Sequence, residues 1–347
     1  MTNRRVKWGI IGTGGIAQTY ASGVSASESG ELVAVGSRDV ASAKAFAGKH
    51  KIPRAHGSYP DLLADPEVEA VYISTPHPMH AEWAIKAAKA GKHILCEKPI
   101  GMNRGEAEAI FSAAKQAGVL VMEAFMYRCH PQTRKVVELI RSGALGVVGS
   151  VQATFSFKNT SGADSRFWSK QLGGGGILDV GCYPVSFSRL VAGAMVGKSF
   201  ANPVEVKALG QLHPQTGVDV VTSAVMRFES GLLAQVSTGV GLFQESTARI
   251  FGLEGWLHVV EPWLPSTGGR PNILVLHREG RGPEQIEVAP DRPLYALEAD
   301  AFARALRAGE SDVPEMSRDD SLGNLAAMDA WRMEIGLTYP TDSQKNF

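Results

Sequence analysis

The chain of 347 residues has no excess charge of either sign and no long hydrophobic run. Lys and Arg together number 35, and Asp and Glu also number 35, so the formal net charge is zero. A nucleic-acid-binding surface needs many unpaired basic groups to displace counterions from phosphates, so we expect no nucleic-acid partner. No apolar run reaches the ~18 residues of a membrane-spanning helix, and no apolar signal stretch follows Met1. We therefore expect a cytoplasmic protein without a membrane partner.

Cysteine is scarce as well. Cys96, Cys129 and Cys182 form no CxxC pair and cannot all be paired with one another, so reduced thiols are the expected state. No group of His, Cys and Asp has the spacing of a metal site, and we predict no metal. In contrast, 44% of the residues are hydrophobic and only 20% are charged. This composition excludes a disordered chain, and the length predicts two domains.

Strand-like and helix-like patterns alternate from residue 6 to residue 124. Short apolar runs typical of buried parallel strands stand at 6–11, 31–37, 71–74, 94–96 and 119–122. Helix patterns lie between them at 15–26, 80–90 and 104–117. Strands and helices in alternation form a parallel sheet that helices cover on both faces. We therefore predict the α/β fold class, with a doubly wound Rossmann domain over residues 1–124.

From residue 125 onward the pattern changes to mostly β. Helix patterns remain at 133–141, 295–308 and 317–335. Between them, alternating segments stand at 150–157, 204–212, 218–228, 232–239, 250–259 and 273–277. We predict an α+β domain over residues 125–347 with a large, mostly antiparallel sheet and helices on one face. The other face would need a cover, so we expect a homodimer or a homotetramer.

A glycine-rich loop follows the first predicted strand and opens the first predicted helix. Its sequence, Gly12-Thr13-Gly14-Gly15-Ile16-Ala17, matches GxGxxG/A. The first glycine permits a tight turn, the second lets the backbone approach a pyrophosphate, and the small sixth residue lets the helix pack on its strand. The phosphates would lie on free N–H groups at the positive end of the helix dipole. The loop therefore indicates a dinucleotide cofactor, with a purely structural glycine turn as the alternative.

The end of the second strand separates NADP from NAD. An acidic residue there would bind the ribose hydroxyls and repel a 2′-phosphate. This chain has Ser37 and Arg38, and a hydroxyl and a guanidinium suit a phosphate. Asp39 follows directly; it either turns toward the ribose or caps the helix that begins near Ala41. We predict NADP as the cofactor, with NAD as the less favoured one.

Several motifs occur in an order that resembles one enzyme family. They are the segments 65–71 (DPEVEAV), 74–77 (STPH) with His80, 96–99 (CEKP) and 174–184 (GGGILDVGCYP). Together with the glycine-rich loop, they make nearly the whole chain similar to the Gfo/Idh/MocA oxidoreductases. The resemblance implies a nicotinamide-dependent enzyme, and it suggests a cis peptide bond between Lys98 and Pro99.

One position narrows the resemblance to a branch of that family. Many members carry histidine where this chain has Tyr183. Tyrosine followed by proline is similar to the branch of glucose–fructose oxidoreductase, dimeric dihydrodiol dehydrogenase and NADP-dependent aldose dehydrogenases. This branch favours NADP, in agreement with the residues that end the second strand.

The resemblance assigns roles to three residues. It makes Tyr183 the proton acceptor, Lys98 a contact of substrate and cofactor, and Asp179 a hydrogen-bond partner of a sugar hydroxyl. A lysine ammonium lowers the pKa of a neighbouring tyrosine because it stabilises the phenolate. Asp179 stands four positions before Tyr183, so the two would share a helical face. The alternatives are a surface lysine, a core tyrosine and an aspartate that only begins a helix.

Other residues are expected near the cofactor or the substrate. Strand ends that face the expected crevice precede Thr75, Pro76 and His77, and Glu97 would lie near the nicotinamide ribose. His80 either approaches the same region or only packs its own helix. Candidate donors to a polyol substrate at the junction of the domains are Arg128, His130 and Arg166, for which a structural role is equally open.

These residues predict an NADP-dependent oxidoreductase. It would transfer a hydride between the nicotinamide and a sugar, at C1 of an aldose, or a cyclic vicinal diol. Three alternatives remain: a reductase of a keto-sugar or an anhydro-sugar, an NAD-assisted glycoside hydrolase, and a cofactor-sensing protein without turnover. The presence of both Lys98 and Tyr183 argues against the sensor, which needs neither.

Overall fold

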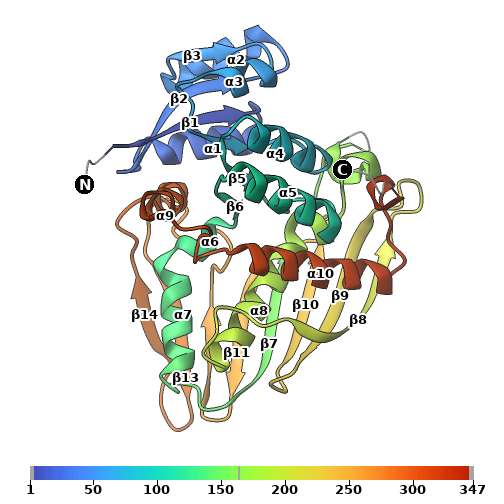
Figure 1. Ribbon diagram of the computed structural model, residues 1–347. Coiled ribbons are helices and arrows are strands. Elements are labelled where there is room, and N and C mark those ends of the chain that lie inside the picture. Colours follow the sequence, from blue (N-terminus) through green and yellow to red (C-terminus); the bar gives the residue numbers. More distant parts are fainter. Residues whose placement is uncertain (1–3, 163–164, 344–347) are drawn as a thin grey trace.

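A six-stranded parallel sheet forms the first part of the chain (Figure 1). The computed structural model describes residues 4–162 and 165–343, so residues 1–3, where we predict no signal stretch, lie outside it. The strands are β1 (Val6–Ile11), β2 (Gly30–Gly36), β3 (Arg54–His56), β4 (Ala70–Ile73), β5 (His93–Glu97) and β6 (Val121–Ala124). Their order is β3-β2-β1-β4-β5-β6, and every neighbouring pair is parallel. The predicted doubly wound sheet is confirmed.

Five helices connect these strands and cover the sheet. They are α1 (Gly15–Val24), α2 (Val40–His50), α3 (Tyr59–Ala64), α4 (His80–Lys89) and α5 (Arg104–Ala117). The winding direction reverses at β1, because β2 and β3 lie on one side of it and β4 to β6 on the other. Ligands of such sheets bind in the crevice outside the carboxyl ends of the strands at this reversal. The residues that follow β1 and β4 are therefore placed at the expected cofactor crevice.

An eight-stranded sheet follows, in the order β14-β13-β12-β11-β7-β10-β9-β8. The strands are β7 (Val148–Ser156), β8 (Pro203–Leu212), β9 (Asp219–Phe228), β10 (Leu233–Gly239), β11 (Thr247–Gly252), β12 (Gly255–Val259), β13 (Asn272–Arg278) and β14 (Glu284–Val288). Strands β7 and β10 pair in parallel, and all other neighbours in the described sheet are antiparallel. The predicted class, a Rossmann sheet followed by a mostly antiparallel sheet, is confirmed.

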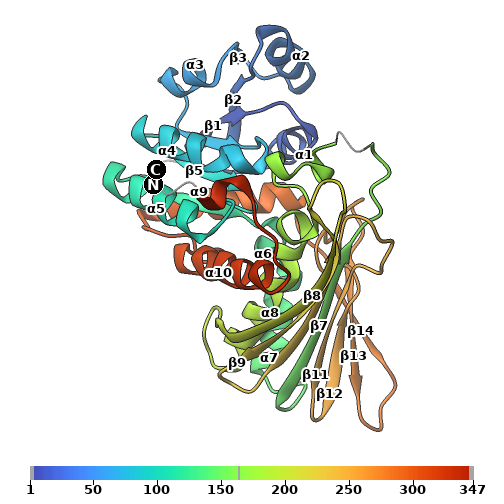
Figure 2. The same cartoon turned by 90° about the vertical axis from the view of Figure 1, so that its right-hand side faces the viewer.

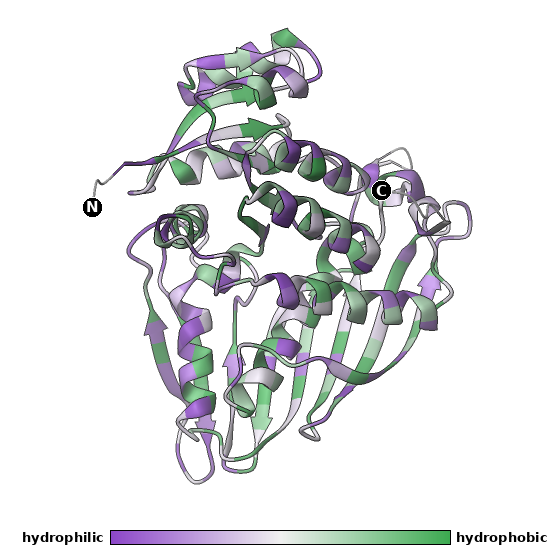
Figure 3. Cartoon of the chain, in the orientation of Figure 1, coloured by the Kyte–Doolittle hydropathy of each residue, from purple (hydrophilic) through white to green (hydrophobic). Residues whose placement is uncertain are grey.

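Helices cover one face of the second sheet (Figure 2). The helices of this part are α6 (Met126–Cys129), α7 (Pro131–Arg141), α8 (Cys182–Met195), α9 (Leu294–Ala308) and α10 (Arg318–Glu334). Figure 3 shows hydrophobic and hydrophilic residues alternating along α7 and α10, as expected for helices with one buried face. Within the described chain, no helix covers the opposite face of the sheet, where Leu209 and Val225 are exposed.

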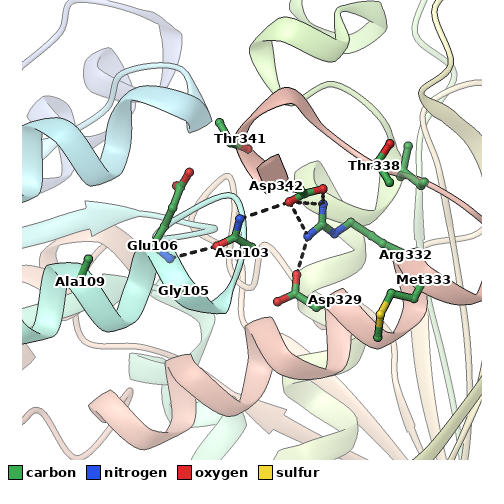
Figure 4. Close-up of a pocket in the computed structure, with 11 residues that line it drawn as sticks. Asn103, Gly105, Glu106, Ala109, Asp329, Arg332, Met333, Thr338, Thr341 and Asp342 are labelled. Carbon is green, nitrogen blue, oxygen red and sulfur yellow. Dashed lines mark hydrogen bonds and ion pairs between the residues drawn. The ribbon is translucent and has the colours of Figure 1, made fainter. Parts of the chain in front are cut away.

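The two sheets are joined where α5 meets the end of α10 (Figure 4). The side chain of Asn103 donates a hydrogen bond to Asp342 over 3.2 Å. Arg332 of α10 pairs with Asp329 at 2.6 Å and with Asp342 at 3.1 Å. These contacts tie the first turn of α5 to the last described segment of the chain, around a cavity of about 600 Å³.

Some elements differ from the prediction. The segment expected as one strand at 250–259 is the hairpin of β11 and β12, and β3, β14, α3 and α6 were not predicted. Helix α8 was expected only through the helical face that Asp179 and Tyr183 would share. Its full extent was missed because nearly all of its residues are buried, so it lacks the amphipathic period that reveals a helix. None of the described helices combines the length and apolarity that a bilayer crossing requires.

Candidate active site

The glycine-rich loop turns sharply after β1. Gly12 has a φ of +105°, which only glycine adopts readily, and its amide donates to the Gly36 carbonyl over 3.0 Å. A Cβ at this position would lie 2.9 Å from the Ser74 hydroxyl oxygen. Residue 12 must therefore be glycine for β1, β2 and the end of β4 to meet here.

The amino end of α1 is free to bind an anion. Its N-cap is Gly14, no side chain caps it, and its first turn carries no acidic residue. A Cβ built on Gly14 or Gly15 would meet nothing within 4 Å, so the loop borders open space. Ala17 is fully buried beneath it. Unpaired amides at a helix start and a small residue beneath them fit a dinucleotide pyrophosphate.

The residues that end β2 divide into a buried hydroxyl and exposed charges. Ser37 is buried, whereas Arg38 and Asp39 are exposed. The Asp39 carboxylate accepts a hydrogen bond from the Ser42 amide over 2.8 Å and caps α2. Of the two roles left open by the sequence, Asp39 thus has the helix cap.

A cavity of about 510 Å³ lies beside the start of α1 and receives most of the predicted site residues. Its lining includes Gly14, Gly15, Ile16, Thr75, Pro76, His77, His80, Glu97, Lys98, Arg166, Asp179 and Tyr183. These residues come from the start of α1, from the end of β5 and the segments that follow β4 and β5, from the segment before α8 and from α8 itself. Among described residues, no group of His, Cys, Asp and Glu is arranged to hold a metal ion.

Lys98 follows β5 and points at the segment that precedes α8. Its Nζ donates to the backbone carbonyl of Asp179 over 2.7 Å and lies 5.1 Å from the centre of the Tyr183 ring. The peptide bond between Lys98 and Pro99 is cis, as the family resemblance suggested. The ammonium therefore lies over the face of the ring, with a carbonyl as its hydrogen-bond partner.

Tyr183 lies in the first turn of α8 and is only 3% exposed. Its hydroxyl donates to the sulfur of Met126 over 3.4 Å, and the rings of Phe125 and Phe155 each pack edge-on at 5.3 Å. Burial raises the pKa of Tyr183 well above its ordinary value. The expected lowering by Lys98 is not found, because apolar groups surround the phenol and the ammonium bonds elsewhere. The protein around Tyr183 favours the protonated phenol.

Asp179 stands between three basic groups. Its Oδ1 lies 2.9 Å from Nη1 of Arg166 and 3.9 Å from Nε2 of His77. Burial by itself raises the pKa of this carboxyl, but the charges of Lys98 and Arg166 outweigh burial and lower the pKa below its ordinary value. Asp179 is thus a buried carboxylate that carries its charge.

Two histidines line the same cavity in neutral form. Burial lowers the pKa of His77 to about 3 and that of His80 to about 4. Each ring nitrogen of His80 lies near a backbone carbonyl, Pro99 O at 2.7 Å and Thr75 O at 2.8 Å, and the single N–H of the neutral ring donates to one of the two. His80 therefore bridges the loops that follow β4 and β5, and this packing position holds both loops at the cavity.

Glu97 ends β5 and also lines the cavity. It is buried, and the Tyr72 hydroxyl donates a hydrogen bond to its Oε1. Burial raises the pKa of Glu97, and the Lys98 charge only partly opposes this.

Two of the three candidate substrate donors lie elsewhere. Arg128 is buried in an ion pair with Asp320 at 2.7 Å. His130 caps α7, with Nδ1 accepting from the Gln132 amide over 3.1 Å. Neither lines the 510 Å³ cavity, whereas Arg166 does. Arg128 and His130 therefore have structural roles, which the sequence had left open for them.

The sequence reasoning missed the apolar side of the cavity. Met126, Phe155, Leu264 and Tyr295 also line the cavity. Only Met126 gave a usable signal, because it comes two residues after the end of β6, at the sheet edge where ligands bind. The other three belong to the second part of the chain and carry no local motif.

Comparison with known proteins identifies the family of this chain. Residues 6–125 match the model of an oxidoreductase family with an NAD-binding Rossmann fold, and residues 133–258 match the Gfo/Idh/MocA C-terminal domain. The chain belongs to the Gfo/Idh/MocA oxidoreductases. The identification from the motifs is confirmed, and an oxidoreductase activity of the dehydrogenase and reductase type goes with it.

Its relatives in this family act on different substrates. D-xylose 1-dehydrogenase (NADP(+)) 2 of Haloferax volcanii is 38% identical over 93% of this chain and 95% of that protein. Trans-1,2-dihydrobenzene-1,2-diol dehydrogenase of Mus musculus is 31% identical over 98% of this chain and 99% of that protein. Among solved structures, the 3-ketoreductase KijD10 of Actinomadura kijaniata in complex with NADP and TDP-benzene is 30% identical. It has a TM-score of 0.86 and covers 96% of this chain and 98% of that one.

Proposed function

We propose that this protein is an NADP-dependent oxidoreductase of a sugar, at C1 of an aldose, or of a cyclic vicinal diol. One observation carries the proposal: Lys98 and Tyr183 lie 5.1 Å apart, ammonium to ring centre, in a cavity that also contains the free amino end of α1. A hydride acceptor and a proton-transferring phenol would thus meet at one carbon. The xylose and dihydrodiol dehydrogenases among the relatives support these two substrate classes.

The cofactor would be held by the loop and strand ends that form the crevice. Residues 12–17 would bind the pyrophosphate, and Ser37 with Arg38 the 2′-phosphate, with Thr75, Pro76, His77 and Glu97 toward the nicotinamide. When bound, NADP supplies or accepts the hydride. The NADP in the KijD10 structure and in the name of the xylose dehydrogenase supports this cofactor over NAD.

The proton would move at the Tyr183 hydroxyl. During oxidation the substrate hydroxyl loses its proton to Oη of the Tyr183 phenolate, which becomes the phenol, while a hydride leaves the same carbon for the cofactor, so the C–OH becomes C=O. Lys98 would contact the substrate and offset the cost of a buried phenolate. Asp179, charged and held by Arg166, would accept a hydrogen bond from a second hydroxyl.

A reductase of a keto-sugar is the second candidate. Burial raises the pKa of Tyr183 and keeps the phenol protonated, which is the form that donates to a carbonyl. The 3-ketoreductase KijD10 shares the fold at 30% identity. The same residues would then act in the reverse direction.

A substrate screen tests the proposal in both directions. Aldoses, polyols and cyclic diols are offered with NADP, and keto-sugars with NADPH, while the absorbance of the reduced cofactor is followed. We expect turnover with at least one aldose or diol and its loss in Tyr183→Phe. Tight NADPH binding without turnover of any compound would favour the cofactor sensor and contradict the proposal. Substrate cleavage with the cofactor unchanged would indicate the glycoside hydrolase.

We further propose a homodimer or a homotetramer in the cytoplasm, built from domains 1–124 and 125–347. The open sheet face with its exposed Leu209 supports the assembly. The three cysteines are buried and free, which suits a reducing compartment.

A further inference from the structure

A buried aspartate outside the cavity holds the segment on which Asp179 and Tyr183 stand. Asp219 begins β9 and is 0% exposed. Its Oδ2 accepts a hydrogen bond from the backbone amide of Ile177 over 2.8 Å, between residues that are 42 apart in sequence. Neither the family motifs nor the cavity lining includes Asp219.

We propose that Asp219 is a positioning residue for the reaction: its carboxylate caps the π-helical turn that sets Asp179 and Tyr183 against Lys98. The turn spans Ile177–Gly181 and leads directly into α8. Its own N-cap residue is Gly176, which has no side chain to offer, so the cap comes from β9. Amides at the start of a helix have no partner within the helix and need one from outside.

The glycines before the turn make room for this carboxylate. Gly175 has a φ of +106°, and a Cβ there would overlap Oδ1 of Asp219. A Cβ on Gly176 would lie 3.1 Å from Oδ2 of Asp219 and 2.9 Å from Cα of Gly239. The glycine run of the second motif thus leaves room for the carboxylate of Asp219.

Two other side chains also bond to the backbone of the glycine run. The Tyr339 hydroxyl donates to the Gly174 carbonyl over 2.6 Å, and the Thr238 hydroxyl donates to the Gly176 carbonyl over 3.2 Å. Both bonds hold carbonyl oxygens. Among the described side chains, Asp219 is the one that accepts from the first amide of the turn. Without Asp219, the first amide of the turn therefore loses its hydrogen-bond partner, while the carbonyls of the preceding glycine run keep theirs.

The turn transmits this constraint to the reacting groups. Asp179 lies in its middle, and its backbone carbonyl accepts the 2.7 Å hydrogen bond from Lys98. Tyr183 follows two residues after the turn ends. A shift of the turn would hence move the partner of Lys98 and the phenol together, and 1 Å of misplacement in a reacting geometry can cost ~100-fold in rate.

Two variants of Asp219 test the proposal, which rests on the proposed function. Asp219→Ala removes the cap, and we expect kcat per folded molecule to fall about tenfold or more while the Kd for NADPH stays unchanged. Asp219→Asn keeps an oxygen that accepts from the Ile177 amide, so it should recover most of kcat. Asp219→Val, whose side chain has no acceptor, replaces Asp219→Ala as the uncapped variant should the latter fail to fold.

The matched control is Asp312→Ala, which removes an aspartate that accepts from the Arg318 amide at the start of α10 and does not line the cavity. It should lower the Tm and leave kcat as in the wild type.

A double-mutant cycle shows whether Asp219 acts through Tyr183. In the Tyr183→Phe background, Asp219→Ala should cost little further rate, because the group that it positions is gone. Losses that multiply in the double variant, or an uncapped variant that keeps kcat within about twofold, would overturn the proposal.

Hydrogen exchange separates this inference from the proposed function. Exchange of the peptide that contains residues 174–183 should be faster in the uncapped variant than in the wild type or in Asp219→Asn. Unchanged exchange overturns the capping role even in an active enzyme. Faster exchange in the uncapped variant, together with a wild type that shows no turnover of any compound, would refute the proposed function and leave the capping role in place.

Discussion

The ammonium of Lys98 donates its hydrogen bond to the backbone carbonyl of Asp179, 81 residues later in the chain. This bond crosses from the end of β5 in the first sheet to the turn before α8 in the second part of the molecule. It places the lysine ammonium over the Tyr183 ring, and the phenol hydroxyl donates instead to the sulfur of Met126. The charge of Lys98 therefore acts first on Asp179, whose pKa it lowers against the effect of burial.

The first prediction concerns Tyr183 and Lys98. Tyr183→Phe keeps the ring and removes one oxygen, so the fold and the NADPH affinity should persist while kcat falls roughly a hundredfold, the usual scale for the loss of a general acid or base. Lys98→Met should lower kcat comparably and also raise KM. Steady-state kinetics with the best substrate of the screen measures both variants.

The pH dependence gives a further check on Tyr183. Because burial raises the pKa of Tyr183, the phenol stays protonated throughout the neutral range. Reduction of a carbonyl should be independent of pH there, and oxidation should become faster as pH rises. A Phe variant with near-normal kcat would transfer the proton role to another group and refute this assignment.

The second prediction concerns cofactor choice. Fluorescence titration should show NADPH binding at least about tenfold tighter than NADH, because a charge-assisted hydrogen bond to the 2′-phosphate is worth roughly 1.5–3 kcal/mol. Arg38→Ala should remove most of this difference. Lys44→Ala, an exposed cation on α2, is the control for net charge and should preserve it. Equal affinities in the wild type would contradict the NADP assignment.

The sequence predicted the parts of this molecule that depend on neighbours in the chain. Alternating strands and helices revealed the first sheet, and the loop from Gly12 to Ala17 with the free start of α1 revealed the cofactor crevice. Contacts between distant segments could not be predicted. Arg128 resembled a substrate donor because its partner, Asp320, stands 192 residues later. Local spacing could not show this ion pair.

The third prediction distinguishes Arg128 from Arg166. Arg128 is buried against Asp320, which also pairs with Arg189, so Arg128→Met should lower the free energy of unfolding by about 2 kcal/mol, the scale of a lost charge-assisted hydrogen bond, without a change in KM. Arg166 pairs with Asp179 through a side chain that is 43% exposed. Arg166→Met should leave stability nearly unchanged and raise KM. Urea unfolding and steady-state kinetics on both variants measure these effects. A raised KM in Arg128→Met with a loss of stability in Arg166→Met would contradict the placement of these residues.

The fourth prediction concerns Glu123 on β6. Burial raises the pKa of this carboxyl to about 7, although hydrogen bonds from Ser321 and the Ile100 amide and the charge of Arg189 oppose it. The folded protein thus keeps this proton to a higher pH than the unfolded chain. The stabilisation from this proton is complete below the unfolded pKa and is lost as pH rises toward 7.

Glu123→Gln removes this titration. Its free energy of unfolding relative to the wild type should therefore rise between about pH 5 and about pH 8, by on the order of 3 kcal/mol for a shift of this size. Glu138→Gln, on an exposed carboxylate that pairs with Lys135, should show no such trend. A difference between Glu123→Gln and the wild type that is constant with pH would contradict the raised pKa.

The fifth prediction concerns the open face of the second sheet. Leu209 is 85% exposed and Val225 is 46% exposed on neighbouring strands β8 and β9, along a groove of about 730 Å³. The two side chains are diagonal neighbours in the strand register, and apolar side chains grouped on an uncovered sheet face favour an interface. Light scattering at micromolar concentration should therefore give two or four times the 37.0 kDa chain mass.

Leu209→Asp with Val225→Asp should shift the mass to the monomer, because a buried, unpaired carboxylate is costly. Leu253→Asp, an equally exposed leucine at the β11–β12 turn, should leave the assembly intact. A monomeric wild type would mean that this face needs no cover, and dissociation by Leu253→Asp alone would move the interface to the end of the sheet.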